Sequence, residues 1–462
     1  MLDARQLEAL ATVVEHGSFG AAAQAFDDSD WQPVDLPHDW ASESPIEKEA
    51  NIAQGYRKRG FGWYRRHFQV DPADRGKHFE LQFDGVSTHC TVWVNGTVVH
   101  RNWCGYTSFS ADITPLLKYG DEFNTVAVRV DAEAQEGWWY EGAGIYRHTW
   151  MVKRSPVHIV TDGVFAQPVK APDGQWSIPA EVTLANSGGK NAKPTVEVTL
   201  LDPDGKALVS ASQSCDVAVL GEATAKLTLA VKNPRLWSVD SPTMYSVKTV
   251  LKDGERILDE TLTPAGFRTL RFDAATGFYL NDKPLKIQGV CVHQDHAGVG
   301  VAMPDAMWEF RVRKLKEMGV NAMRCSHHPP AAELLQVCDR MGMLVMDEVR
   351  NFNTSPEYIR KLEWMVRRDR NHPSVFMWSV FNEEPFQGTE VGYEMTRRLV
   401  AAVKRLDTTR PVTAAMNFGF MNPINVSQAV DVMGFNYQQK SYDAFHKLNP
   451  NLPVLSSEDT SA

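Results

Sequence analysis

The feature that most constrains the fold is an alternation of short apolar segments with longer amphipathic segments, from about residue 270 onward. Seven apolar segments have the character of strands: "LKIQGVCVH", "VNAMRCSHH", "LVMDEV", "VFMWSVFNEE", "PVTAAMN", "VDVMGFNY" and "PVLSSE". Helical patterns fall between them, at 305–318, 356–370 and 388–406. Strands and helices that alternate every 25 to 30 residues or so are typical of a parallel sheet closed into a (β/α)₈ barrel.

The sequence stops at Ala462, before an eighth strand, so we expect a C-terminally truncated (β/α)₈ barrel over 268–462. Its first and seventh strands would keep unpaired edges. Each buried unpaired polar group costs about 1 to 3 kcal/mol, against about 5 to 15 kcal/mol for the stability of a whole domain. We therefore expect this chain to be poorly soluble or nearly inactive, with a protease-resistant β-rich fragment at about residues 27 to 268.

Two regions before the barrel show the period-two alternation of β-strands. In the first, 27–155, Asn95-Gly96 lies between "VWV" and "VV" and predicts a tight type I′ hairpin, because both central residues must take positive φ. The second, 156–267, has the size of an immunoglobulin-like sandwich and no cluster of reactive side chains. We interpret the second region as a spacer and packing domain.

The first 26 residues have a helical pattern and resemble the opening of a LysR-type transcription regulator. No recognition helix follows, because the next residues are "DDSDW". We interpret this stretch as a fusion scar or a mispredicted start. The net charge of -9 would repel a phosphate backbone, and no apolar run approaches the roughly 20 residues of a membrane span. We expect neither nucleic acid nor membrane as a partner; no signal peptide is visible.

Polar side chains stand where the predicted barrel strands end. In such barrels the carboxyl ends of the strands form the active-site rim, so these residues should converge. A lone acid at a strand end is more often part of a salt bridge, and it is the convergence that favours a functional site. The residues are His293, Asp295, Arg324, His327, Asp347, Glu348, Asn382, Glu383, Asn436, Tyr437 and Glu458.

Glu383 and Glu458 supply two carboxyl groups from the fourth and seventh strands, which face each other across a barrel mouth. Cleavage of a glycoside needs such a pair, one to protonate the leaving oxygen and one to attack or stabilise the sugar carbon. Asn382 is suited to bind a sugar 2-hydroxyl, and Tyr437 could donate to Glu458. Glu384 should point away from the centre by the period of two.

At these residues the chain resembles glycoside hydrolase family 2. The resemblance rests on "DSDWQPVDLPHDW", "VWVNG", "WWYEGAGIYR", "NAMRCSHHP", "HPSVFMWSVFNEEP", "GFNY" and "LSSED", in the family's order. It implies a jelly-roll sugar-binding-like domain, an immunoglobulin-like domain and a barrel. It also implies the acid/base at Glu383, the nucleophile at Glu458, and sugar-binding roles for His293, His327 and Asn382.

The sequence departs from the family at one place. Metal-dependent β-galactosidases of the family keep an acidic magnesium ligand a few residues after the Asp-Glu of strand three, where Phe352 stands here. Phe cannot bind a hard cation, so we expect neither a metal nor another cofactor. Asp347 and Arg324 are candidates for substrate contact. An ion pair of Asp347 or Glu348 with Arg324 or Arg350 is an equal alternative.

Three functions remain open from the sequence. The first is a retaining exo-glycosidase acting on a carbohydrate, a β-galactoside by resemblance, with a β-glucuronide as the second choice. The second is a catalytically silent carbohydrate-binding protein, and the third is a transcription regulator. Turnover of a chromogenic β-glycoside separates the first two, and a DNA mobility assay tests the third.

Overall fold

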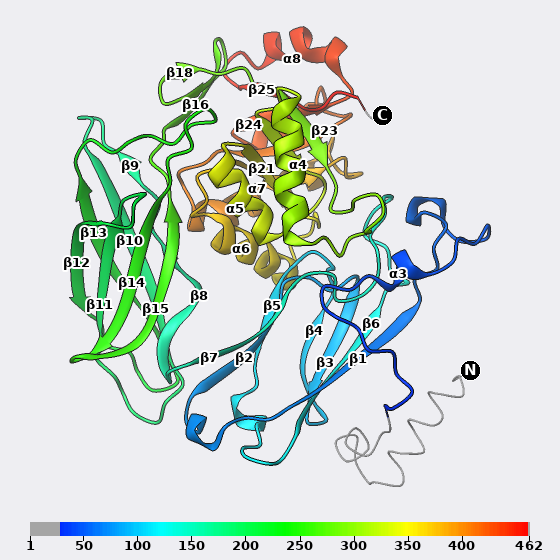
Figure 1. Ribbon diagram of the computed structural model, residues 1–462. Coiled ribbons are helices and arrows are strands. Elements are labelled where there is room, and N and C mark those ends of the chain that lie inside the picture. The colour runs from blue at the N-terminus through cyan, green and yellow to red at the C-terminus, as the bar shows by residue number, and fades with distance from the viewer. Residues whose placement is uncertain (1–27, 461–462) are drawn as a thin grey trace. The chain divides into compact units, whose positions relative to one another are not determined.

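A computed structural model describes residues 28–460, so the LysR-like stretch lies outside the described residues (Figure 1). The chain forms two compact units. Unit 1 comprises residues up to 156 together with 294–304, and unit 2 comprises 157–293 and the residues from 305 onward. Between residues 28 and 460, no helix has both the length and the apolar character to cross a membrane.

Unit 1 is built from two antiparallel sheets around an apolar core. One sheet has the order β1-β6-β3-β4 and the other β5-β2-β7. Their strands are β1 (Phe61–Phe68), β2 (His78–Phe83), β3 (His89–Val94), β4 (Thr97–Asn102), β5 (Phe109–Asp112), β6 (Asn124–Asp131) and β7 (Thr149–Arg154). Asn95 and Gly96 have φ of 48° and 80°, so the predicted hairpin with positive φ at both central residues is confirmed. One short helix, α3 (Trp40–Glu43), precedes the strands.

Residues 294–304 complete unit 1, although they follow the first barrel strand in sequence. Val301 is fully buried in a cluster with Cys104, Tyr106 and Tyr146. The backbone N–H of Val301 donates to Asp39 Oδ2 over 3.1 Å. The small cluster that Val301 joins is separate from the main core of unit 1, whose buried residues lie between Val70 and Ile145.

The first part of unit 2 holds two further antiparallel sheets, with the orders β13-β10-β8 and β12-β11-β14-β15. The strands are β8 (Val157–Phe165), β9 (Val169–Lys170), β10 (Trp176–Asn186), β11 (Thr195–Leu201), β12 (Ala207–Ser214), β13 (Glu222–Val231), β14 (Tyr245–Asp253) and β15 (Arg256–Ala265). On β13 every second residue is buried, which is the alternation that the sequence predicted. A small sheet of β16 (Leu270–Asp273), β17 (Gly277–Leu280) and β18 (Lys283–Pro284) follows.

The rest of unit 2 is a parallel sheet of seven strands in sequence order, as predicted, from β19 to β25. The strands are β19 (Gly289–Val292), β20 (Ala322–Cys325), β21 (Leu344–Glu348), β22 (Val375–Asn382), β23 (Val412–Met416), β24 (Val432–Asn436) and β25 (Val454–Glu458). The sheet curls so that its two edges approach each other. Cys291 Sγ on β19 lies 3.3 Å from the carbonyl oxygen of Ser457 on β25. The result is a nearly closed barrel.

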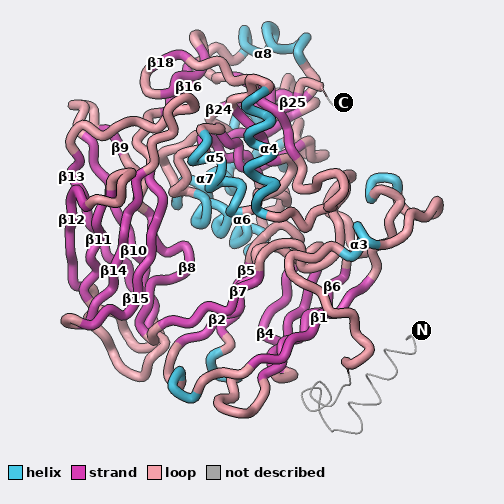
Figure 2. The backbone as a smooth tube through the Cα atoms, in the orientation of Figure 1, coloured by secondary structure: helices cyan, strands magenta, loops and turns pink. Residues whose placement is uncertain are grey.

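Helices connect the barrel strands, and Figure 2 shows nearly all helix in this part of the chain. They are α4 (Asp305–Glu317), α5 (Ala332–Met341), α6 (Pro356–Asp369), α7 (Glu390–Leu406) and α8 (Tyr442–Leu448). Local signals fix their ends: the Thr389 side chain caps α7 by accepting from Gly392 N, and Gly342, with φ of 72°, ends α5. The carboxyl ends of the strands therefore lie on one rim.

Candidate active site

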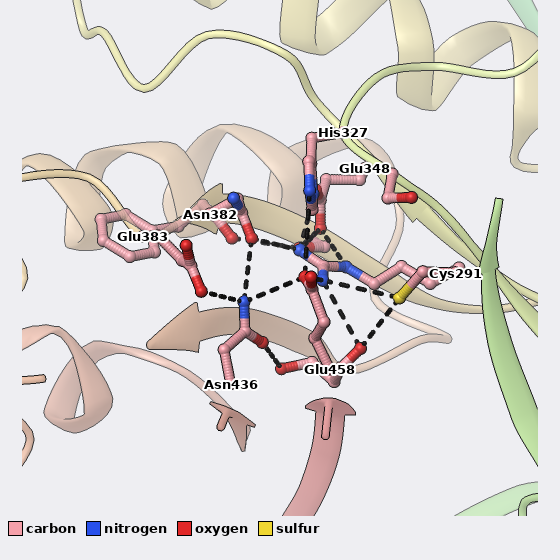
Figure 3. A network of polar contacts seen from close by, with 12 residues as sticks. Cys291, His327, Glu348, Asn382, Glu383, Asn436 and Glu458 are labelled. Atoms are coloured by element: carbon pink, nitrogen blue, oxygen red, sulfur yellow. Dashed lines mark hydrogen bonds and ion pairs between the residues drawn. The ribbon is translucent and has the colours of Figure 1, made fainter. Parts of the chain in front are cut away.

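Polar side chains from six barrel strands meet at the carboxyl ends of the sheet (Figure 3). Glu383 follows the last residue of β22, and Glu458 is the last residue of β25. Glu383 and Tyr437 have φ of 53° and 58°, the left-handed region that residues with a Cβ rarely adopt. Such strained backbone gathers at functional sites, where the rest of the fold holds it in place.

Glu458 is surrounded by hydrogen-bond donors. Arg324 Nη1 lies 3.0 Å from its Oε2, and Asn436 Nδ2 lies 3.3 Å from the same oxygen. The hydroxyl of Tyr437 donates to the other oxygen, Oε1, as predicted from the sequence. His327 Nε2 lies 3.9 Å from Oε2. These donors hold both oxygens of Glu458 in place, as a group that is to act as a nucleophile requires.

Glu383 has a different environment. Asn436 Nδ2 donates to its Oε1 over 2.8 Å. Burial raises the pKa of Glu383; the hydrogen bond from Asn436 opposes this, and the negative charge of Glu458 adds to it. A raised pKa keeps the proton on Glu383 at higher pH, as a general acid requires. Two carboxyl groups in environments this unequal are the usual basis for separate acid and nucleophile roles.

Asn436 joins the two carboxyl groups, and Ser457 fixes its orientation. The Ser457 hydroxyl donates to Asn436 Oδ1 over 2.6 Å, which turns the amide nitrogen toward both acids. Ser457 can do so because the pairing of β24 with β25 shifts by one residue, with Phe435 opposite Ser456 and Asn436 opposite Glu458.

The two carboxyl groups lie close together as a result. Their nearest oxygens are 2.8 and 3.3 Å from the same nitrogen of Asn436, so they cannot be farther apart than the sum of these distances. This limit applies to the nearest pair of oxygens and is compatible with the roughly 5 to 5.5 Å between the carboxyl groups of retaining glycosidases.

Arg324 organises the base of the site and is only 4% exposed. Its guanidinium forms two hydrogen bonds with Glu348, of 2.8 and 3.0 Å, and a third of 2.6 Å to Asn382 Oδ1. Burial opposes its charge, but the carboxylates of Glu348 and Glu458 raise the pKa of Arg324. The geometry therefore places Arg324 behind Glu458, with its donors engaged by protein side chains.

Glu348 and the two histidines lie beside this arginine. His327 Nδ1 is 2.8 Å from Glu348 Oε1, and the Ser379 hydroxyl donates to Glu348 Oε2 over 2.7 Å. Burial lowers the pKa of His327, although Glu348 opposes the shift. His293 Nδ1 is 2.7 Å from the carbonyl oxygen of Ser326, and its ring centroid is 5.9 Å from that of His327. Both rings therefore belong to the rim.

The structure does not bring Asp347 into this group, nor Asp295, which belongs to the 294–304 segment of unit 1. The side chain of Asp347 is fully buried and interacts with Asp369, whose carboxylate pairs with Arg368 at the end of α6. Burial and the neighbouring negative charge of Asp369 raise the pKa of Asp347 well above its usual range. The sequence left open a substrate contact or an ion pair for Asp347 and Glu348. The ion pair with Arg324 is formed by Glu348 and not by Asp347.

Sequence reasoning assigned no role to three side chains of the network. Asn436 was predicted as a polar side chain at the end of a strand, but no sequence pattern indicated that it contacts both carboxyl groups. Ser379 and Ser457 gave no signal, because they stand inside apolar strands. Glu348 was weighed only as an ion-pair partner or a substrate contact.

Phe352, at the position of the family's acidic magnesium ligand, makes an aromatic contact. The rings of Phe352 and Phe381 pack edge to face with centroids 4.8 Å apart. The acids of the network, Glu348 and Glu458, have Arg324 and other donors as neighbours. We still expect a site without magnesium.

Comparisons with known proteins identify relatives of this chain. Three domains of one family match the chain: "Glycosyl hydrolase 2 galactose-binding domain-like" at 43–159, "Glycosyl hydrolases family 2" at 157–268, and "Glycosyl hydrolases family 2, TIM barrel domain" at 274–356 and 350–459. A beta-galactosidase of Bacteroides ovatus is 38% identical over 96% of this chain and 57% of its own length. A beta-glucuronidase of Bacteroides fragilis is 32% identical, over 84% of this chain and 58% of its own.

Solved structures show the same relationship. A glycosyl hydrolase family 2 member from Bacteroides cellulosilyticus superimposes with a TM-score of 0.88 at 36% identity, over 94% of this chain and 58% of its own. The Bacteroides uniformis beta-glucuronidase gives a TM-score of 0.83 at 30% identity, over 93% and 56%. The chain thus spans less than two thirds of the length of these relatives.

Proposed function

Because the chain belongs to family 2 of the glycosyl hydrolases, we propose that it is a retaining exo-acting β-glycosidase in which Glu383 is the general acid/base and Glu458 the nucleophile. The observation that carries the proposal is the unequal pair of carboxyl groups that share Asn436. Glu458 accepts from Arg324, Asn436 and Tyr437, whereas Glu383 has a raised pKa.

The reaction would proceed in two displacements. In the first, a carboxylate oxygen of Glu458 attacks the anomeric carbon while Glu383 gives its proton to the glycosidic oxygen. The glycosidic bond breaks, the aglycone leaves as an alcohol, and an ester links the sugar to Glu458. In the second, Glu383 takes a proton from water, the water oxygen attacks the anomeric carbon, and the ester breaks to free Glu458.

The remaining side chains would bind the sugar or hold the acids. Asn382 accepts through Oδ1 from Arg324 and Asn436, so its Nδ2 is the donor that a sugar hydroxyl would meet. His293 and His327 would contact other hydroxyls. Arg324, first considered as a substrate contact, would act by fixing the position of Glu458.

A β-galactoside is our first choice of substrate, since the Bacteroides ovatus beta-galactosidase matches 96% of the chain. A β-glucuronide is the second choice, because the Bacteroides fragilis relative and the Bacteroides uniformis structure carry that name. A panel of nitrophenyl β-glycosides distinguishes the two. Absence of turnover with every member, by protein shown to be folded, would favour the silent carbohydrate-binding alternative.

The stereochemistry gives a direct test of the two roles. Double displacement releases the sugar with the β configuration that it had in the substrate. Proton NMR of the first-formed product should therefore show the β anomer before mutarotation. If the α anomer appeared first, Glu458 would not be the nucleophile.

A further inference from the structure

Two loops on the catalytic rim carry large apolar side chains that are exposed. One loop, residues 383–389, runs from the acid/base Glu383 to helix α7, and the other, residues 417–425, follows the neighbouring strand β23. The four side chains are Phe386, Phe418, Met421 and Ile424, between 43% and 51% exposed. We call these four side chains the apolar rim. Exposed apolar groups gathered at a site commonly mark a binding surface.

The two loops are fastened to each other by partly buried hydrogen bonds. Gln387 is fully buried, and its side chain bonds Asn417 in both directions: Nε2 donates to Asn417 Oδ1 over 2.7 Å, and Asn417 N donates to Oε1 over 2.9 Å. Phe418 N also donates to Gln387 Oε1, over 3.3 Å. The apolar rim is therefore held by ordered loops before any ligand arrives.

Backbone packing joins the loops further. A Cβ on Gly419 would lie 2.6 Å from the Cα of Gly388, so only glycine allows the two backbones to touch. Asn422 Nδ2 donates to the carbonyl oxygen of Gly388 over 2.8 Å. Because the loops are already ordered, a ligand would bind at a smaller cost in conformational entropy.

The place of the loops in the barrel identifies the part of the substrate that they would meet. Glu383 protonates the glycosidic oxygen, so the aglycone lies on the Glu383 side of the cleaved bond. Phe386 stands three residues after Glu383, and the second loop follows the strand paired with β22. We propose that the apolar rim is the aglycone-binding surface and that the chain selects β-glycosides whose aglycone is an alkyl or aryl group.

This inference rests on the proposed glycosidase function and adds the class of aglycone to it. A sugar as aglycone would need hydrogen-bond partners on this surface, whereas the four side chains offer apolar contact. A second copy of the chain could also cover an apolar surface, and the experiment below separates that occupant from a ligand.

The experiment measures binding, so that it does not depend on turnover. Methyl, propyl and hexyl β-thiogalactosides, and the matching β-thioglucuronides, are titrated calorimetrically into the full chain. Full burial of a methylene group corresponds to about fourfold in affinity, so half burial on an open surface should give about twofold per methylene. Hexyl should then bind about 30-fold more tightly than methyl for the sugar that the protein accepts.

A matched pair of variants shows where the gain arises. Met421→Ala and Phe418→Ala should each reduce the hexyl-to-methyl ratio about fivefold, the loss expected for one partly buried apolar contact. Met318→Ala removes the same side chain from a site that is 74% exposed, in the turn between α4 and β20 at the opposite end of the strands. It should leave the ratio unchanged.

The outcomes separate the aglycone surface from the enzyme activity. Hydrolysis of a nitrophenyl glycoside without any dependence of affinity on chain length would overturn the aglycone proposal and leave the glycosidase function intact. Length-dependent binding that Met421→Ala weakens, without hydrolysis, would support the surface and refute turnover. Failure of folded protein to bind either series would overturn the aglycone proposal together with both choices of sugar, and the nitrophenyl glycoside panel would then decide the glycosidase function separately. Sedimentation that shows a dimer, lost in Met421→Ala but not in Met318→Ala, would assign the surface to a second copy instead.

Discussion

Asn436→Ala removes the one nitrogen that touches both carboxyl groups. In the structure Asn436 Nδ2 lies 2.8 Å from Glu383 Oε1 and 3.3 Å from Glu458 Oε2. Glu458 keeps donors in Arg324 and Tyr437, so the loss falls mainly on Glu383. This variant therefore tests the acid/base more than the nucleophile.

The size of the effect follows from the strength of the lost interaction. A hydrogen bond to a charged group contributes about 1.5 to 3 kcal/mol, which corresponds to about 10- to 150-fold in rate. Glu383 becomes a carboxylate as it gives up its proton, and Asn436 stabilises that form. We expect kcat/KM to fall by this amount for an alkyl glycoside, which needs protonation, and by less for a nitrophenyl glycoside, which needs little.

The pH dependence of kcat/KM shows in which direction the pKa of Glu383 moves in this variant. Burial raises the pKa of Glu383, and the hydrogen bond from Asn436 lowers it. Removing Asn436 should raise this pKa further, so that Glu383 keeps its proton to higher pH. The basic limb of the kcat/KM profile should therefore move to higher pH. A limb that stays in place, or moves to lower pH, would refute the assignment of Glu383 as the acid under the control of Asn436.

Asn321→Ala is the matched control for damage to the fold. Its side chain accepts from Gln288 N over 2.8 Å and donates to the carbonyl oxygen of Lys286 over 2.9 Å, at the amino end of β20. This variant should lower Tm without moving the basic limb. A shift of equal size in the control would mean that the pH profile reports general loosening of the barrel.

Three other predictions concern the roles of single residues. Glu458→Gln should abolish turnover, whereas Glu383→Ala should spare substrates with good leaving groups and gain activity with azide; equal loss in both variants, without rescue, would contradict this division of roles. Activity should survive EDTA, since Phe352 stands in the family's metal-ligand position, and recovery by added magnesium would reveal a site formed by other acids. Asp347→Asn should keep kcat/KM within about threefold, because Asp347 contacts Asp369 and its raised pKa favours the neutral form that Asn mimics; a larger loss would restore it as a substrate contact.

The sequence predicts the barrel well because its signals are local. The predicted helices 305–318 and 356–370 end within one residue of α4 and α6. The helix predicted from 388 begins at Glu390 instead, because the Thr389 side chain caps it. The two carboxyl groups could also be predicted, since each follows an apolar strand of the same sheet.

The contacts inside the site could not be read from the sequence. Asp347 and Glu348 are adjacent acids, and the strand period says only that they face opposite sides. Which of them faces Arg324 depends on how β21 pairs with β20, where Arg324 stands opposite Met346. The bond from Ser457 to Asn436 depends on a shift in the pairing of β24 with β25. Irregular pairing of this kind comes from packing across the whole barrel, and no local pattern records it.

The segment 294–304 sets an order of events during synthesis. Val301 N donates to Asp39 Oδ2 across 262 residues of chain, and Gln294 Oε1 accepts from Arg147 across 147 residues. A nascent chain that has left the ribosome only as far as residue 268 holds all the strands of unit 1 and its main apolar core, but not Val301 of the small cluster with Cys104, Tyr106 and Tyr146. That cluster can therefore form only after residue 301 has been translated, later than the main core of unit 1.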